Sequence, residues 1–358
     1  MKIHLSAATT ADGALDDRSA GRLRISTDAD WAAVQRLRAQ CDAILVGAGT
    51  VRRDNPRLVI ADTVLRTERS KEGRGPDPAK VTVTRTGCLD PASRFFTCGE
   101  GRKIVFSETA LPHLEGAAET VVAERITAAR IATELEKRGT GSLLVEGGAE
   151  ILRMFLAEGM AHTLRLAVNP ALRVADAAAP HFPFDAIRTG TPCRTERLGG
   201  MEVRRYTFRP DRSEEDLRLL REAVELSRRC TPCRSSYCVG AVIATRDGRR
   251  FGGYTHETSP THHAEQEAAA KALAAGADLR GATIYSSMEP CSTRSSEPES
   301  CSELILRHGM ARVVFALYEP DCFVSCRGAL DLREHGVEVE VYPELGDEVR
   351  AINGHLKG

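Results

Sequence analysis

Three residues in the C-terminal third have the side chains and the spacing of a catalytic zinc site. His263 stands two residues before Glu265, where a helix is expected to begin. Cys291 follows an expected strand, and Cys301 comes ten residues later at the expected start of another helix. One imidazole and two thiolates leave the fourth position of a tetrahedral zinc open for water, as in catalytic sites. Zinc would lower the pKa of that water, and we expect Glu265 to carry its proton.

Other interpretations of the thiols remain open. The ligand set could belong to a degenerate domain that keeps it for packing or for a structural zinc, although an open site beside a glutamate has little structural purpose. Cys230-x-x-Cys233 could hold a second metal or form a redox pair, but no partner pair lies nearby in the sequence, so two ordinary thiols are preferred. Of the eleven cysteines, most, such as Cys41 and Cys88, are expected to be small buried hydrophobes.

Two apolar stretches in the N-terminal half end in glycines. Asp42–Thr50 reads as a buried strand that ends in Gly-Ala-Gly, and Ser142–Glu150 reads as a strand that delivers a Gly pair to a helix. Such glycines let backbone amides approach phosphates, and a helix that begins after Gly148 offers its positive end to an anion. Both stretches could therefore face one dinucleotide. A lone Gly-Gly is usually only a tight turn, and the G-x-G-x-x-G fingerprint is absent.

These residues must be positioned by elements that alternate between strand-like and helix-like patterns. Ser26 is expected to cap a helix that presents Trp31, Val34 and Leu37 on one face, and 66–78 is expected to be a surface loop. Further elements of the N-terminal half are expected to be strands at 3–8, 80–84, 103–106 and 201–208 and a helix at 127–138.

The segment 188–210 is rich in Gly, Pro, Arg and Thr and marks the expected boundary between domains 1–210 and 211–358. Ser213 and Asp216 resemble a capping box that opens the next helix. Beyond it we expect helices at 214–228, 263–275 and 301–308 and strands at 238–245, 282–286, 312–316 and 337–341. The predicted fold class is α/β, with two three-layer α/β/α domains.

Composition restricts the class of protein. Hydrophobic residues make up 42% and charged residues 28% of 358 residues, which suits two packed cores. The 49 basic and 50 acidic residues give a net charge of −1, which makes nucleic acid a poor candidate partner. The sequence shows neither a secretory signal nor an apolar stretch of membrane-spanning length, so we expect a cytoplasmic protein that does not interact with membranes.

The zinc motif resembles the cytidine-deaminase-like superfamily, whose pattern is H-x-E followed by P-C-x-x-C. Here nine residues separate the two thiols instead of two, as in the pyrimidine deaminases of riboflavin biosynthesis. The resemblance is closest to the fungal type and extends over about 130 residues. It is specific, because this set of metal ligands is hard to reproduce by chance. The segments that carry it are Tyr237–Val242, His263–Gln266, Met288–Cys301 and Glu319–Val324.

The N-terminal part resembles the dihydrofolate-reductase-like reductases that act beside these deaminases. The motifs are Ala8–Gly13, Leu37–Ala39, Gly47–Pro56 and Val145–Ala149. The resemblance implies that NADPH binds at the motifs Gly47–Pro56 and Val145–Ala149. It also implies that acidic residues line the junction of cofactor and substrate and that Arg38 holds the substrate through its phosphate. The implied cofactor-binding residues are Thr50, Asp54, Glu146, Gly147, Gly148 and Ala149, of which Asp54 and Glu146 also meet the substrate. The family often has an arginine near position 61, where this chain has alanine, so we expect the phosphate contacts to differ.

Together, the two resemblances imply a bifunctional enzyme of riboflavin biosynthesis that uses Zn²⁺ and NADPH on a phosphorylated pyrimidine and forms a homodimer. The deaminase part follows the reductase part, the reverse of the common bacterial fusion, and the fungal-like motifs predict reduction before deamination. Three alternatives stay open: the same chemistries on a specialised pyrimidine or pteridine metabolite, a nucleoside or RNA-base deaminase with an accessory domain, and a regulatory protein that binds NADPH without turnover.

Overall fold

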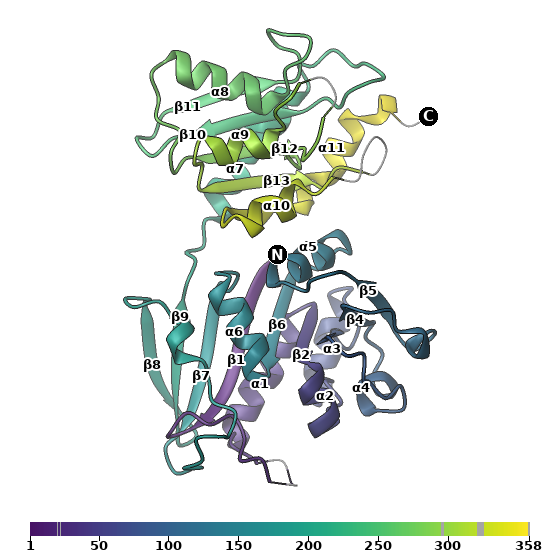
Figure 1. The fold of residues 1–358 in the computed structure, drawn as a ribbon, viewed down its shortest axis with the longest axis vertical. Helices are drawn as coiled ribbons and strands as arrows, with labels where there is room; N and C mark the ends of the chain where they lie inside the picture. Colours follow the sequence, from purple (N-terminus) through teal and green to yellow (C-terminus); the bar gives the residue numbers. More distant parts are fainter. Residues whose placement is uncertain (20, 22, 295–296, 321–325, 357–358) are drawn as a thin grey trace. The chain divides into compact units, whose positions relative to one another are not determined.

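The structure is a computed structural model that describes residues 1–19, 21, 23–294, 297–320 and 326–356. It divides into two compact units, Met1–Pro210 and Asp211–Gly358. Each unit has its own sheet with helices packed against it (Figure 1). The mixed α/β fold class expected from the sequence is confirmed.

The N-terminal unit is built on a nine-stranded sheet with the order β5-β4-β3-β2-β6-β1-β7-β9-β8. The strands from β5 to β7 are parallel, whereas β8 and β9 form an antiparallel edge. All five residues of β2 are buried, as is typical of a parallel strand covered on both faces. The strands are β1 Lys2–Thr10, β2 Ala43–Gly47, β3 Ala79–Thr84, β4 Lys103–Ser107, β5 Glu119–Val122, β6 Ser142–Gly147, β7 Thr163–Asn169, β8 Cys193–Leu198 and β9 Met201–Thr207.

Two local predictions for this unit are wrong. Part of the expected loop 66–78 is helical, because Asp62 caps α3 by accepting hydrogen bonds from the backbone of its first turn. Thr27, not Ser26, caps α1, and Trp31 is 38% exposed while polar residues of α1 are buried. The helices are α1 Asp28–Gln40, α2 Ala48–Asp54, α3 Thr63–Lys71, α4 Arg94–Thr97, α5 Ala128–Lys137 and α6 Ala149–Ala157, with 3₁₀ turns η1 Pro112–Leu114 and η2 Phe184–Ala186.

The C-terminal unit has a five-stranded sheet with the order β11-β10-β12-β13-β14, in which β12, β13 and β14 are parallel. Strand β10 pairs antiparallel with both of its neighbours. Its elements are α7 Ser213–Ser227, β10 Gly240–Ala244, β11 Arg250–Tyr254, α8 Ala264–Ala274, β12 Thr283–Met288, α9 Cys301–Arg307, β13 Arg312–Leu317, α10 Gly328–Glu334, β14 Glu338–Val341, η3 Pro343–Leu345, α11 Gly346–Ile352 and η4 Gly354–Leu356.

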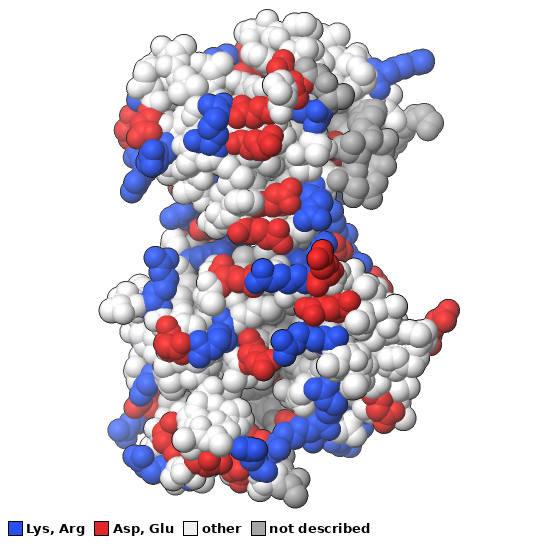
Figure 2. Space-filling model, viewed as in Figure 1, with Lys and Arg blue, Asp and Glu red and all other residues white. Residues whose placement is uncertain are grey.

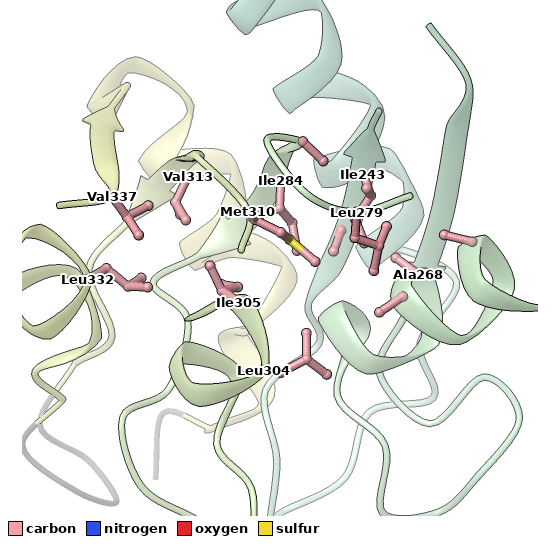
Figure 3. Close-up of a cluster of buried hydrophobic side chains, with 14 of the residues drawn as sticks. Ile243, Ala268, Leu279, Ile284, Leu304, Ile305, Met310, Val313, Leu332 and Val337 are labelled. Atoms are coloured by element: carbon pink, nitrogen blue, oxygen red, sulfur yellow. The ribbon is translucent and has the colours of Figure 1, made fainter. Parts of the chain in front are cut away.

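Alternate residues of these strands feed two hydrophobic clusters on opposite faces of the sheet. Ile243 and Val313 belong to the cluster shared with α8, α9 and α10, shown in Figure 3, whereas Val242 and Val314 pack with α7 and α11. The period of two follows from strand geometry. Helices therefore cover both faces, which is the three-layer arrangement expected for this unit.

Asp216 does not act as part of a capping box. Residue 212 occupies the N-cap position without a side-chain cap, and Asp216 is buried. Its carboxylate accepts two hydrogen bonds of 2.6 Å from Arg312 on β13, and others from Tyr285 at 3.1 Å and Tyr342 at 2.8 Å. The capping prediction is wrong because this aspartate fastens α7 to the sheet.

The surface carries mixed charge. On the face drawn in Figure 2, basic and acidic side chains are interspersed. Among the described residues, no helix combines the length and the apolar character that crossing a bilayer requires.

Candidate zinc and nucleotide sites

The three predicted zinc ligands converge in the C-terminal unit. His263 is the N-cap residue of α8, Cys291 follows β12, and Cys301 is the first residue of α9. Their ligand atoms all lie within 4.8 Å of one another. The Nδ1 atom of His263 is 3.6 Å from the Sγ atom of Cys291 and 3.4 Å from that of Cys301.

These separations fit zinc. Tetrahedral bonds of about 2.3 Å to sulfur and about 2.0 Å to nitrogen place the sulfur and nitrogen ligand atoms about 3.6 Å apart. Both thiols are buried, and hydrogen bonds from Cys301 and His263 lower the pKa of Cys291 despite its burial. The same contact with Cys291, together with burial, raises the pKa of Cys301. One thiolate is thus favoured before a metal binds, and binding would release the remaining thiol proton.

Glu265 lies beside this cluster and is 3% exposed. Its Oε1 atom accepts a 2.8 Å hydrogen bond from the Ser286 hydroxyl on β12, and its Oε2 atom lies 3.3 Å from the Cys301 sulfur. The carboxylate is therefore held at a fixed position next to the ligand cluster. Ser286 was not predicted as a site residue. The one indication of its role is that it is a polar residue within the buried strand β12.

Glu289 is a second supporting residue that the sequence did not reveal. This carboxylate is 4% exposed and accepts hydrogen bonds from the backbone amides of Ala329 at 2.9 Å and Glu319 at 3.3 Å. It ties the chain that precedes Cys291 to the chain that follows β13. Burial raises the pKa of Glu319, near the zinc ligands, to about 6. Residues 321–324 of the expected 319–324 motif lie outside the described residues.

The remaining thiols have different surroundings. Within the described part of the chain, the three-ligand cluster is the one group of His, Cys, Asp and Glu found with metal-binding spacing, so Cys230 and Cys233 do not form part of a second. Cys41 is buried, as expected, but Cys88 is exposed. The expectation for Cys88 is wrong because it lies in a loop between β3 and α4 rather than at a strand.

In the N-terminal unit, the two glycine stretches end side by side. Val46 of β2 pairs with Gly147 of β6, so α2 and α6 begin at the same edge of the sheet. Gly148 has a φ of 82°, which favours glycine, and a Cβ atom there would lie 3.7 Å from the Thr50 hydroxyl. The structure thus brings Thr50 next to the Gly-Gly turn, and Ala149 opens α6 directly after it.

This turn has the features of a nucleotide cradle. A Cβ atom added at Gly147 would meet no atom within 4 Å, so there is open space beside that backbone. The amides at the start of α6 have no intrahelical acceptors, which makes this end suitable for an anion. The residues present therefore fit a dinucleotide phosphate.

Arg38 and Glu146 form a buried bidentate ion pair. Nε and Nη2 of Arg38 each donate to Glu146 at 2.6 Å, and Nη1 donates to the Val59 carbonyl at 3.1 Å. The two side chains are only 8% and 12% exposed. The guanidinium also lies 4.9 Å from the centre of the Trp31 ring. Asp54 ends α2, one turn beyond Thr50, so all the predicted reductase residues except Arg38 lie at strand ends or on the helices that follow them.

An α/β chain with a three-ligand zinc site in one unit and a nucleotide cradle in the other has the features of an enzyme with two active sites. Comparison with known families is specific. The model of the RibD C-terminal domain matches residues 1–182, just over half of the chain, and that of the cytidine and deoxycytidylate deaminase zinc-binding region matches residues 213–317. The chain belongs to the RibD family and joins a RibD-type reductase domain to a zinc-binding deaminase domain.

Individual relatives align with half of the chain or less. A 2,5-diamino-6-ribosylamino-4(3H)-pyrimidinone 5′-phosphate reductase of Archaeoglobus fulgidus is 32% identical over 175 residues, covering 47% of this chain and 80% of that protein. A diaminohydroxyphosphoribosylamino-pyrimidine deaminase of Schizosaccharomyces pombe is 32% identical over 185 residues, covering 49% and 45%. The riboflavin biosynthesis protein RibD of Aquifex aeolicus is 38% identical over 115 residues, covering 32% and 31%. The chain thus spans less than half the length of the last two relatives.

Proposed function

We propose that this protein catalyses two steps of riboflavin biosynthesis on 2,5-diamino-6-ribosylamino-4(3H)-pyrimidinone 5′-phosphate. The reductase is assigned to residues 1–210 and the deaminase to residues 211–358. The observation that carries the proposal is the convergence of His263, Cys291 and Cys301 beside the buried carboxylate of Glu265. Support comes from a relative named as a reductase of this compound and from one named as a diaminohydroxyphosphoribosylamino-pyrimidine deaminase, each of which aligns with about half of the chain.

In the deaminase, His263, Cys291 and Cys301 would hold zinc, which supplies a Lewis acid that lowers the pKa of a coordinated water. Glu265 is the proposed catalytic residue. Its carboxylate accepts the proton of the attacking water and delivers it to the leaving amino group, while the Ser286 hydrogen bond keeps the carboxylate oriented. Oxygen then replaces the ring amino group.

In the reductase, Thr50, Gly147, Gly148 and Ala149 would bind NADPH, which supplies a hydride to the opened ribosyl group. The turn at the start of α6 would hold its phosphates, and Asp54 and Glu146 are assigned to the junction with the substrate. Since Glu146 accepts two hydrogen bonds from Arg38, we assign Arg38 the task of fixing Glu146. Contact between Arg38 and the substrate phosphate, which the family resemblance implies, stays a separate prediction.

We further infer that reduction precedes deamination, as the fungal-like motifs around the zinc ligands suggest. Comparing the deamination rate of the ribosylamino compound with that of its ribitylamino product tests this order. Much faster deamination of the unreduced compound would reverse it.

The same chemistries on a specialised metabolite form the alternative. Ala61, which replaces the arginine often found in the family, has no side chain for a phosphate, and its backbone amide donates to Gln35 at 2.6 Å. Failure of the gene to restore growth of a riboflavin auxotroph, despite both activities in vitro on an analogue, would favour that alternative.

The proposed setting is a cytoplasmic homodimer that acts on a small phosphorylated pyrimidine and binds neither nucleic acid nor membranes. Light scattering coupled to size-exclusion chromatography measures the assembly. Binding to tRNA or activity on cytidine would instead favour a nucleoside or RNA-base deaminase.

The decisive experiment is mass spectrometry of the products formed by zinc-loaded protein, with and without NADPH. Hydride transfer to carbon together with uptake of one proton adds about two daltons, and exchange of an amino group for oxygen adds about one dalton. Glu265→Gln should abolish only the second change. No mass change under either condition would reject the riboflavin assignment.

A further inference from the structure

The long segment between Cys291 and Cys301 is fastened to the helix that carries the third ligand. Nη1 of Arg294 donates to the side-chain oxygen of Gln266 at 2.5 Å. Nη2 of the same guanidinium donates to the Thr261 carbonyl. Arg294 therefore reaches both sides of His263 in the sequence, one contact on each.

Gln266 connects this arginine to the ligand histidine. The Gln266 Oε1 atom accepts a 3.0 Å hydrogen bond from the backbone amide of His263, as in a capping box. The same oxygen accepts the hydrogen bond from Arg294. One side-chain oxygen thus links the segment between the two cysteines to the backbone of the third ligand.

A second contact fastens the same two segments. The Thr261 hydroxyl donates a 2.6 Å hydrogen bond to the carboxylate of Glu297. On the histidine side, the buried Glu267 accepts hydrogen bonds from the Thr258 amide at 2.9 Å and the Thr258 hydroxyl at 2.7 Å. The chain that leads into His263 is thus contacted by Glu267 of α8 and by two residues of the segment between the cysteines, Arg294 and Glu297.

These contacts matter because the ligands come from separate segments. A closed loop has conformational freedom that grows with its length, and zinc requires its ligands within a few tenths of an ångström. The superfamily spacing of two residues leaves little such freedom, whereas nine residues leave much more. Contacts that orient metal ligands from outside the coordination sphere typically change metal affinity 10- to 100-fold when removed.

We propose that Arg294 is a positioning residue of the zinc site: through Gln266 and Thr261 it fixes the segment that carries Cys291 and Cys301 against the His263 backbone. The proposal rests on the proposed function of the site as a zinc centre. It assigns Arg294, which lies between the two thiols in the sequence, the task of setting the relative position of the ligands.

The test measures metal binding rather than turnover. Zinc affinity is determined by competition with a chromophoric chelator, and the visible spectrum of the cobalt-substituted protein reports the ligand geometry. Arg294→Gln should weaken zinc binding about 10- to 100-fold and alter the cobalt spectrum, with partial recovery in Arg294→Lys, which keeps a positively charged donor but not the two-pronged geometry. Arg350→Gln removes an exposed arginine of α11 and is the matched control, expected to match the wild type.

Thr261→Val guards against a misfolded arginine variant, because it removes only the threonine hydroxyl, which contacts Glu297 and the Ser259 hydroxyl, and should weaken zinc binding about 3- to 10-fold. Wild-type zinc affinity and an unchanged cobalt spectrum in both Arg294→Gln and Thr261→Val would overturn the proposal. Failure of the proposed function looks different: the wild-type protein would then bind zinc normally yet deaminate nothing, and the variants would still differ from it in zinc affinity.

Discussion

The Arg38–Glu146 pair allows the sharpest test of the reductase half, because the family resemblance implies one task for Arg38 and our proposal from the ion pair gives it another. If Arg38 serves the substrate phosphate, Arg38→Met should raise the KM for the substrate and leave the free protein unaffected. If it fixes Glu146, the two residues must be coupled before any ligand binds. The 2.6 Å contacts of two nearly buried side chains favour the second outcome.

The magnitude follows from burial. Breaking a buried ion pair by removing one partner costs about 3–5 kcal/mol, since the other charge stays buried, whereas replacing both charges with apolar groups is often close to neutral. Arg38→Met and Glu146→Leu should therefore each lower the free energy of unfolding of the N-terminal unit by about 3 kcal/mol, and the double variant should recover most of that loss. All three variants should bind NADPH more weakly, because Glu146 adjoins the Gly147-Gly148 turn.

The assay uses urea unfolding followed by tryptophan fluorescence. Trp31 is the one tryptophan of the chain, and its ring lies against the Arg38 guanidinium, so its fluorescence reports the unfolding of the N-terminal unit directly. Additive losses in the double variant, or single losses below about 0.5 kcal/mol, would refute the ion-pair reasoning. A raised KM for the substrate alone would then return Arg38 to the phosphate.

Further predictions concern the deaminase unit and the pH response. Ser286→Ala should lower the deaminase kcat about tenfold with zinc content unchanged, because Glu265 loses its 2.8 Å partner; equal loss of zinc would indicate a structural role instead. Asp216→Ala should destabilise the C-terminal unit by about 3–5 kcal/mol in thermal unfolding, whereas the exposed Asp347→Ala should change it by less than about 0.5 kcal/mol. Burial, with His162 nearby, lowers the pKa of His4 to about 4, so the unfolded chain binds more protons between about pH 4 and 6.5. The N-terminal unit should therefore lose stability as the pH falls through that window, by up to about 3 kcal/mol, and a His4→Gln variant should lose less.

Local sequence was sufficient where a pattern and its chemistry lie close together. The H-x-E motif fixes a histidine and a glutamate on one helical turn, and glycines after apolar strands indicate where the backbone must approach a ligand. The α/β class, the family and the zinc and NADPH chemistry could therefore be predicted and are confirmed by the fold and the comparisons. The roles of the individual site residues remain proposals.

Tertiary structure decided which partner each polar side chain takes. The sequence indicated Asp216 as a cap, yet an arginine 96 positions away takes up its charge. Arg38 pairs with a glutamate 108 positions away, a partner that the pattern of its own segment does not reveal. No local sequence pattern indicates the roles of Ser286 and Arg294, because their hydrogen-bond partners, Glu265 and Gln266, belong to another element. Burial makes an unpaired charge or hydrogen-bonding group unfavourable, so these side chains are paired with partners brought to them by tertiary packing. The spacing of residues within one segment does not determine that packing, so these pairs could not be predicted from the sequence.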